Sequence, residues 1–139
     1  CRTPMAWESH QPNAGFSTGQ PWLPVPADHI VRAANTQESD PASVLSHYRR
    51  MLAFRRTQPA LVKGDIRFLA AQGDALALLR THGNEQIVCV FNLGPGRGEI
   101  LLEPATTAIA LEGHGLDGAL VDGNVVHLEP YAAWFGRLV

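Results

Sequence analysis

The chain has 139 residues, of which 45% are hydrophobic and 17% are charged, and its formal net charge is −2. This length is enough for one ordinary domain with a hydrophobic core. The weakly acidic charge argues against a nucleic-acid-binding protein, which would carry a basic surface. No apolar run approaches the roughly 20 residues of a membrane-spanning helix, so neither nucleic acid nor a membrane is an expected partner.

Residues 1–38 are rich in aromatic residues and proline but show neither helical periodicity nor strand alternation. The aromatic residues are Trp7, Phe16 and Trp22, and the prolines are Pro4, Pro12, Pro21, Pro24 and Pro26. Irregular segments longer than about 12–15 residues are uncommon in compact domains unless they are functional or disordered. Disorder fits poorly with aromatic side chains that favour burial. We therefore expect an irregular segment that needs a partner surface from a domain outside this chain.

The two cysteines, Cys1 and Cys89, do not form the disulfide framework of a small secreted domain. Cys89 lies in the apolar run 87–91 and is interpreted as a small buried hydrophobic residue. Cys1 could be a lipid-modified or nucleophilic terminus, but no pattern places a base near it. We interpret the start without Met as a truncation point in a longer protein.

A helix is predicted over residues 41–57. Asp40 is a suitable N-cap, and Pro41 fits the first helical position, where its missing N–H costs nothing. Pro59 disfavours helical geometry in the residue before it, so the helix is expected to end near Thr57. Its largely apolar face consists of Val44, Tyr48, Met51, Leu52 and Arg55. Because these residues recur at helical spacing, we expect this face to pack on a sheet or between two bodies.

From about residue 64 the sequence predicts β structure, because short apolar or alternating runs are separated by turn residues. Strands are expected at residues 66–69, 75–80, 86–92, 99–102, 107–111, 119–121, 125–128 and 132–138. Asp122-Gly123 is the strongest tight-hairpin signal. Short strands at intervals of roughly 8–12 residues indicate an antiparallel sandwich or barrel. Trp134 and Phe135 should lie on opposite faces of the last strand, whereas Phe68 and Phe91 are expected in the core.

Candidate catalytic and metal-binding groups are few. The six histidines are scattered and no Cys-x-x-Cys occurs, so neither a metal site nor a cofactor is expected. Glu38 and Asp40 could form a carboxylate pair for acid–base chemistry, but their position before a helix favours capping and interaction with the helix dipole. The predicted helix also carries Arg49, Arg50, Arg55 and Arg56. With a net charge of −2, these arginines are interpreted as a solvated face with some ion pairs to a neighbouring domain.

Several motifs carry a resemblance to a known family. The first runs are Cys1-Arg2-Thr3-Pro4-Met5-Ala6-Trp7, Asn13-Ala14-Gly15-Phe16-Ser17-Thr18 and Pro21-Trp22-Leu23-Pro24-Val25. They resemble the segment after the eighth barrel strand in glycoside hydrolase family 13, in its α-glucosidase and oligo-1,6-glucosidase branch. The helical run Asp40-Pro41-x-Ser43-Val44-Leu45 resembles the last barrel helix of those enzymes. The runs Val90-Phe91-Asn92-Leu93 and Leu128-x-Pro130-Tyr131-x-Ala133-x-Phe135 resemble signatures of the family's C-terminal β domain.

The resemblance covers essentially the whole chain and implies an α+β fragment. Residues 1–60 would be the last loop and helix of a (β/α)8 catalytic barrel. Residues 61–139 would be a C-terminal antiparallel β-sandwich of about eight strands. The parent would be an exo-acting, cytoplasmic α-glucosidase acting on maltose- or isomaltose-type oligosaccharides or sucrose-like substrates. It would retain configuration through a covalent glucosyl intermediate on a carboxylate, with a carboxylic acid as general acid/base.

In the family those carboxylates lie on earlier strands, so no catalytic residue is expected in this chain and the isolated chain should be inactive. The residue carried over is Arg2, which in the family contacts the non-reducing glucose and pairs with an Asp from the amino-terminal part of the barrel. A guanidinium can hold a carboxylate and still donate to a sugar hydroxyl. Ala6 stands where the family usually has Pro or Gln, which leaves linkage preference open.

The expected partners are therefore an α-glucoside oligosaccharide, bound through the parent enzyme, and the rest of the catalytic barrel. The alternative is a stand-alone carbohydrate-binding or structural β-sandwich module. Residues 1–38 resemble active-site loop sequence rather than a linker, which favours the fragment.

Overall fold

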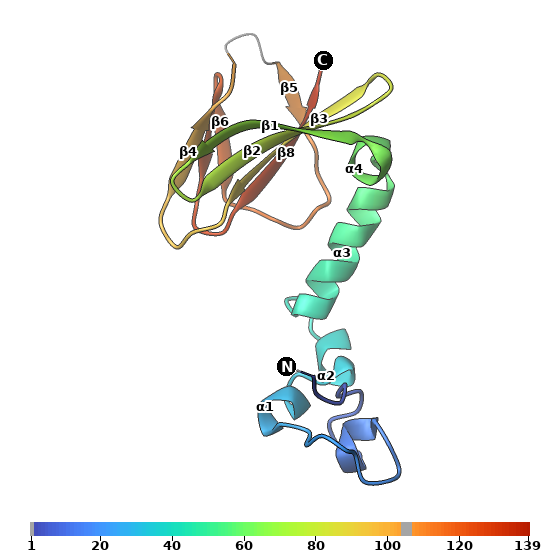
Figure 1. Cartoon of the computed structure of the whole chain (residues 1–139). Helices are drawn as coiled ribbons and strands as arrows, with labels where there is room; N and C mark the ends of the chain where they lie inside the picture. Colours follow the sequence, from blue (N-terminus) through green and yellow to red (C-terminus); the bar gives the residue numbers. More distant parts are fainter. Residues whose placement is uncertain (1, 104–106) are drawn as a thin grey trace. The chain divides into compact units, whose positions relative to one another are not determined.

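The computed structural model describes residues 2–103 and 107–139. Its chain divides into two compact units, Cys1–Arg50 and Met51–Val139 (Figure 1). Helices and antiparallel strands together make a mixed α+β architecture, as predicted. The interpretation of Cys1 stays a prediction, because this residue lies outside the described range.

The first unit is built from short helical turns joined by loops. They are η1 (Pro12–Gly15), α1 (Ala27–Ile30), α2 (Ala34–Glu38) and the beginning of α3 (Val44–Arg56). The sequence predicted no regular structure before residue 39, and three of these turns correct that expectation. Each has at most five residues, which is too short to produce a helical period. A small core holds them together and consists of Ala6, Ala14 and Ala33 with Val25 and Ile30.

Helix α3 begins at Val44 rather than at the predicted Pro41. Asp40 Oδ1 accepts a hydrogen bond from the Ala42 N–H at 2.8 Å, which forms a turn before the helix. Ser43 Oγ accepts the Ser46 N–H at 3.2 Å, so Ser43 is the N-cap. The predicted apolar face is not buried as a whole, since Val44 is 77% exposed. Two overlapping capping signals stand before this helix, and the later one sets its start.

The second unit contains α4 (Pro59–Lys63) followed by antiparallel strands. In its described part these are β1 (Asp65–Gln72), β2 (Ala75–His82), β3 (Glu85–Asn92), β4 (Gly98–Leu101), β5 (Ala108–Ala110), β6 (Ala119–Asp122), β7 (Val125–Leu128) and β8 (Ala133–Leu138). Each overlaps a predicted strand. A five-stranded sheet has the order β1-β2-β3-β8-β5, and a three-stranded sheet has the order β4-β7-β6. Along the described strands the chain therefore changes sheets four times, between β3 and β4, β4 and β5, β5 and β6, and β7 and β8.

Two-residue turns that begin with glycine set the register of the hairpins. Gly73, Gly83 and Gly123 each have a φ of +58° at the first central position of the turn. This left-handed conformation is open to glycine at no steric cost and is required at that position by a type II′ turn. The predicted Asp122-Gly123 hairpin is among them.

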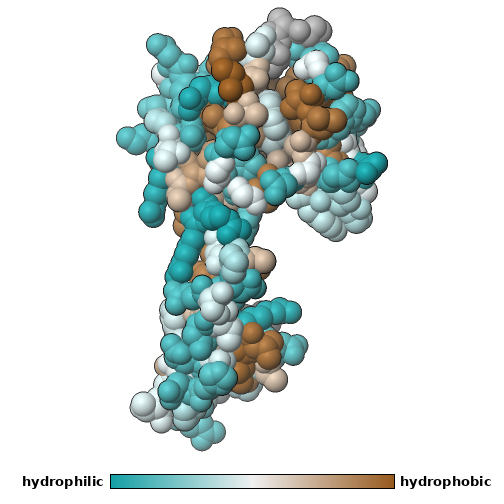
Figure 2. Space-filling model, turned by 180° about the vertical axis from the view of Figure 1, so that it is seen from behind, coloured by the Kyte–Doolittle hydropathy of each residue, from teal (hydrophilic) through white to brown (hydrophobic). Residues whose placement is uncertain are grey.

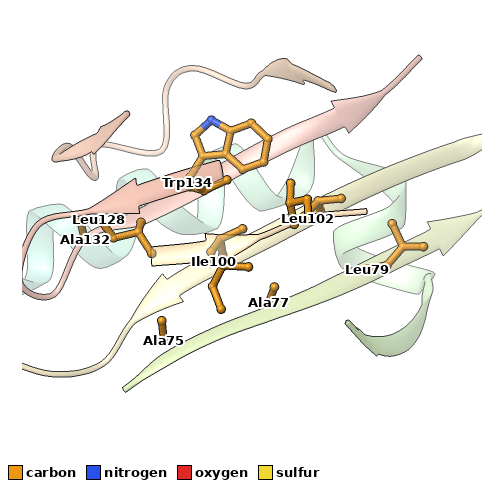
Figure 3. Close-up of a cluster of buried hydrophobic side chains, with 11 residues drawn as sticks. Ala75, Ala77, Leu79, Ile100, Leu102, Leu128, Ala132 and Trp134 are labelled. Carbon is orange, nitrogen blue, oxygen red and sulfur yellow. The ribbon is translucent and has the colours of Figure 1, made fainter. Parts of the chain in front are cut away.

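The two sheets share a hydrophobic core that is lined by one face of each (Figure 3). Ala75, Ala77 and Leu79 of β2 meet Ile100 of β4 in this core, and the next residues of β2 point to the other face. Residues from β3, β7 and β8 complete it: Val88, Val90, Val126, Leu128 and Trp134. Alternation along each strand thus decides which side chains are buried between the sheets.

Trp134 and Gly136 of β8 pack directly against each other. The Trp134 indole lies over Gly136, so a Cβ at position 136 would overlap the ring. Phe135 points to the opposite face, as predicted, and packs 5.2 Å from the Phe54 ring. Phe68, by contrast, was expected in the core and is 71% exposed. Its side chain lies on the outer face of the sheet rather than on the inner face.

Asn92, at the end of β3, is a buried polar residue whose amide is fully used. Its Nδ2 donates to the Gly96 carbonyl at 2.6 Å and to the Glu129 carbonyl at 3.0 Å. Its Oδ1 accepts the Gly94 N–H at 3.1 Å. The Gly94 carbonyl in turn accepts the N–H of Tyr131, a residue with a φ of +58°. Asn92 therefore ties the β3–β4 loop to the turn before β8.

Replacing Asn92 by Ala would remove the partner of the buried Gly94 N–H and of the partly buried Gly96 and Glu129 carbonyls. We expect the free energy of unfolding to fall by about 2–4 kcal/mol, measured by denaturant titration of the full chain. Asn84→Ala, in an exposed hairpin turn, is the matched control and should change stability by less than about 0.5 kcal/mol. Equal effects of the two substitutions would contradict the role assigned to Asn92.

Gly136→Ala should also destabilise the chain, because the added methyl group forces the Trp134 ring to move in a packed core. The expected cost is about 1–3 kcal/mol, seen as a lower midpoint in thermal melting. Gly96→Ala provides the control, since a Cβ there would meet nothing within 4 Å. If both variants melted together, the proposed overlap with the indole would be wrong.

Candidate functional site

Arg2, the predicted substrate-binding residue, lies at a pocket of about 390 Å3 in the first unit. The pocket is lined by Arg2, Thr3, Pro4, Phe16, Trp22 and Leu23. Trp22 is 98% exposed and Phe16 is 48% exposed. A guanidinium offers several N–H donors in one plane, and aromatic rings offer flat apolar faces. This combination suits a ligand that has both hydroxyl groups and an apolar face, as a sugar ring does.

A sharp chain reversal brings Phe16 back towards the segment that carries Arg2. Asn13, Ala14 and Gly15 have consecutive positive φ angles of 51°, 52° and 70°, a conformation that Asn and Gly adopt more readily than other residues. The Ala14 carbonyl accepts the Trp7 N–H at 2.9 Å. A Cβ at Gly15 would stand 3.0 Å from the Glu8 Cβ, so a side chain there would press on the neighbouring strand of chain. The left-handed backbone and the close approach to Glu8 therefore explain why Asn13 and Gly15 suit this turn.

The residues after Arg2 are also pinned by a second segment. The carbonyls of Ala6 and Trp7 accept the N–H groups of Ala34 and Asn35, each at 3.0 Å. The Ala6 side chain is only 5% exposed and packs in the small core of the first unit. Position 6 is thus an interior position here, with space for a methyl group.

Glu38 and Asp40 do not form a catalytic carboxylate pair. Glu38 is the last residue of α2, and its Oε1 accepts a hydrogen bond from Arg49 Nη2 at 2.7 Å. Both side chains are more than half exposed, so this ion pair contributes at most about 1 kcal/mol. Asp40 binds a backbone N–H in the turn before α3. These contacts agree with the structural interpretation of Asp40, and the interaction of Glu38 with the dipole of the helix stays a prediction.

A larger hollow of about 630 Å3 lies in the second unit, away from Arg2 in sequence and composition. Arg97 Nη2 pairs with Glu129 Oε1 at 2.9 Å, and His127 Nδ1 lies 3.6 Å from Glu99 Oε2. All four side chains are largely in solvent, and no aromatic residue lines the hollow. Its size alone does not make it the better candidate site.

Within residues 2–103 and 107–139, no three or more His, Cys, Asp or Glu residues lie together as metal ligands. No helix in the same ranges combines the length and apolar character that crossing a membrane requires.

Comparisons with known proteins agree on one family. The model of the α-amylase catalytic domain matches residues 1–64. A probable α-glucosidase of Rhizobium meliloti (strain 1021) is 49% identical over 138 residues, which are 99% of this chain and 24% of that protein. The chain belongs to glycoside hydrolase family 13.

Two further members of the family extend the comparison. Glucan 1,6-α-glucosidase of Streptococcus pneumoniae serotype 4 is 32% identical over 80% of this chain and 21% of its own. The crystal structure of the α-glucosyl transfer enzyme XgtA superposes with a TM-score of 0.90 at 34% identity, covering 100% of this chain and 26% of that one. The chain thus spans about a quarter of the length of the family members it matches.

Membership of the family agrees with the sequence resemblance. No sequence motif, however, predicted that residues other than Arg2 line this pocket. The sequence predicts that the segment with Phe16, Trp22 and Leu23 needs a partner surface, but it does not predict that these residues are neighbours of Arg2. The left-handed turn at residues 13–15 reverses the chain before Phe16, and all three residues line one pocket with Arg2. The role of Arg2 itself stays a prediction.

Cys89 is a buried free cysteine, and the pKa of its thiol is shifted. Burial raises the pKa of the Cys89 thiol from 9.0 to about 12, and the nearby Arg80 guanidinium only partly opposes this effect. The thiolate is the reactive form of cysteine, so Cys89 is inert at neutral pH. It packs with Phe135 on the outer face of the five-stranded sheet, as a small hydrophobic residue.

The raised pKa of Cys89 predicts a pH dependence of stability. The folded state favours the neutral thiol, so its contribution is complete below about pH 9 and is lost as the pH rises towards 12. Above pH 9 the free energy of unfolding should therefore fall with pH more steeply than in Cys89→Ala, by up to about 1.4 kcal/mol per pH unit. Denaturant titrations of both proteins between pH 8 and 10.5 measure the difference, and parallel profiles would contradict it.

Proposed function

We propose that this chain is the C-terminal part of a retaining, exo-acting α-glucosidase. Residues 1–60 are then the last loop and helix of its (β/α)8 catalytic barrel, and residues 61–139 its C-terminal β-sandwich domain. The observation that carries the proposal is the Arg2 pocket with Phe16 and Trp22, within the segment matched by the catalytic-domain model. The substrates in this proposal are maltose- or isomaltose-type oligosaccharides or sucrose-like glucosides, and the location is cytoplasmic.

The exposed apolar surface of the first unit supports a barrel as its partner. Met5, Trp7, Phe16 and Tyr48 are each about half exposed or more, and Trp22 is almost completely exposed. Figure 2 shows hydrophobic side chains at the surface of both units. Apolar clusters of this kind on a soluble protein mark surfaces that contact another body. The rest of the barrel would cover them.

In this proposal Arg2 binds substrate while the covalent chemistry takes place on residues of the barrel outside this chain. One carboxylate of the barrel attacks the anomeric carbon, and a carboxylic acid protonates the leaving oxygen. The Arg2 guanidinium pairs with a barrel carboxylate and donates an N–H to a hydroxyl of the terminal glucose, which fixes the sugar for in-line attack. Without the two carboxylates the isolated chain has neither nucleophile nor acid, so it should be inactive.

A chimera tests the proposal directly. In it, this chain replaces the 138 aligned residues of the Rhizobium meliloti relative. The chimera should hydrolyse an aryl α-glucoside, and Arg2→Ala should lower kcat/KM by about 100- to 1,000-fold, because a barrel carboxylate would lose its partner. Arg97→Ala, at an 80% exposed side chain, is the control and should leave kcat/KM within about twofold.

The isolated chain provides the second arm of this experiment. It should show no turnover of the same aryl α-glucoside. Activity that survives purification and is unaffected by Arg2→Ala would sink the proposal, as would an Arg2→Ala chimera as active as its parent.

A further inference from the structure

Residues 111–118 connect β5 to β6 and are called the strap (the orange loop after β5 in Figure 1). Two leucines of the strap, Leu111 and Leu116, pack against the apolar cluster on the outer face of the five-stranded sheet. The Leu111 N–H donates to the Phe135 carbonyl at 2.8 Å, and the Gly118 carbonyl accepts the N–H of the residue after β7 at 2.7 Å. Backbone hydrogen bonds therefore hold the strap at both of its ends.

His114, near the middle of the strap, is the most buried histidine of the chain. It is 8% exposed, whereas the other five histidines are half-buried or exposed. The centroid of its ring lies 5.3 Å from that of Phe54 in α3 and 5.0 Å from that of Phe135 in β8. The imidazole therefore contacts both the end of α3 and the last strand of the sheet.

The hydrogen bond of the His114 ring fixes its protonation state. The Leu116 N–H donates to His114 Nδ1 at 3.1 Å. A neutral imidazole has one N–H group and one acceptor nitrogen, so an accepting Nδ1 places the proton on Nε2. In a protonated imidazole both nitrogens are donors, and Nδ1 can no longer accept the Leu116 N–H. The closed strap thus requires the neutral ring.

The charged groups on the elements around His114 do not stabilise a cation at this ring. Those of α3, α4 and the strap are exposed: Arg55, Arg56, Lys63, Glu112 and Asp117. Arg137 of β8 pairs with Glu85, and burial keeps the Cys89 thiol neutral by raising its pKa to about 12. Within the described residues His114 has no carboxylate at ion-pairing distance. A charged ring there would lose hydration without gaining a counter-ion, and phenylalanine rings attract a cation only weakly.

The backbone on both sides of His114 has the freedom to turn the ring outward. Gly113 and Gly115 have φ angles of 90° and 72°, and both residues are exposed. Glycine adopts this region and many others without steric cost. We propose that His114 is a pH-sensitive latch, in which protonation of the imidazole releases the strap from α3 and β8 while the two sheets stay folded.

The core between the sheets does not depend on the strap, because no residue of 111–118 belongs to that core. On release, Phe54 keeps its contact with Phe135 and loses the one with His114. The end of α3 is therefore held less firmly in acid than at neutral pH. This inference goes beyond the proposed glucosidase function and is independent of it, since all its contacts lie within Met51–Val139.

Amide hydrogen exchange of the full chain, followed by NMR, measures the opening of the strap. A solvent-exposed imidazole is about 10% protonated at about pH 7.5 and about 90% protonated at about pH 5.5. Because only the open strap binds this proton, the protection factor of the Leu116 amide should fall about tenfold between these two pH values. The Leu102 amide, which donates to the Asn124 carbonyl at 2.8 Å outside the strap, is the internal control and should keep its protection factor.

Asparagine is the matched substitution for His114. Its Oδ1 can accept the N–H two residues further on, as in an Asx turn, and it does not titrate. In His114→Asn the Leu116 protection factor should therefore be the same at both pH values. His82→Asn removes an exposed histidine at the end of β2 and is the control, in which the tenfold fall should remain.

The nitrogen NMR shifts of the imidazoles provide a readout without any substitution. At about pH 7.5 the His114 ring of the wild-type chain should carry its proton on Nε2 alone. On acidification, the change to the doubly protonated ring should coincide with the loss of protection at the Leu116 amide. A ring with its proton on Nδ1 at neutral pH would contradict the latch, even if His114→Asn failed to fold.

Equal protection of the Leu116 amide at the two pH values in the wild-type chain would overturn the inference. A tenfold fall that persists in His114→Asn would do the same, because another group would then be titrating. If the Leu102 amide lost protection together with Leu116, the whole unit would be unfolding in acid, and a latch confined to the strap would be wrong.

Discussion

The β unit depends on the side-chain amide of Asn92. The described strands pass between the two sheets four times, and Asn92 stands where the crossing after β3 meets the crossing before β8. Backbone groups at a crossing no longer pair with a neighbouring strand and need other hydrogen-bond partners. The Asn92 amide supplies three such hydrogen bonds, two as donor and one as acceptor. An Asp or a Leu at this position has the right size but lacks the two N–H donors.

The sequence predicted the strands well because their determinants are local. Alternation of apolar residues and glycine at the first turn position define each hairpin, and no distant contact is needed to read them. Phe68 shows where this reasoning stops. Alternation assigns a side chain to a face, but it does not say which face is covered. In this unit both faces of the large sheet are apolar because helices form a second layer on one of them, so a phenylalanine on the outer face looked like a core residue.

The family of the first unit could be predicted from its motifs, but its geometry could not. Its helical turns are too short to have a period, and the start of α3 depended on a choice between Asp40 and Ser43 that only contacts can decide. Arg2 was singled out by resemblance alone. Its pocket arises from three consecutive left-handed residues, a feature with no apolar pattern, although Asn13 and Gly15 are residue types that tolerate it. Family membership says which chemistry to expect there, and the turn explains how two aromatic rings come to stand beside one guanidinium.

The carboxylate of Glu85 links α4 to β8. This link has a consequence for the order in which these segments fold. It holds the start of α4 with one oxygen and Arg137 of β8 with the other, so segments near residues 60, 85 and 137 close on a single group. During synthesis β8 emerges after all the other strands, and until then Glu85 and Gln58 lack their guanidinium partner. The attachment of α4 therefore matures last, when the final strand enters between β3 and β5. A ribosome-bound chain that still lacks β8 would carry its catalytic segment on a loosely held helix, which couples completion of the β unit to the positioning of Phe54, Ala60 and Leu61.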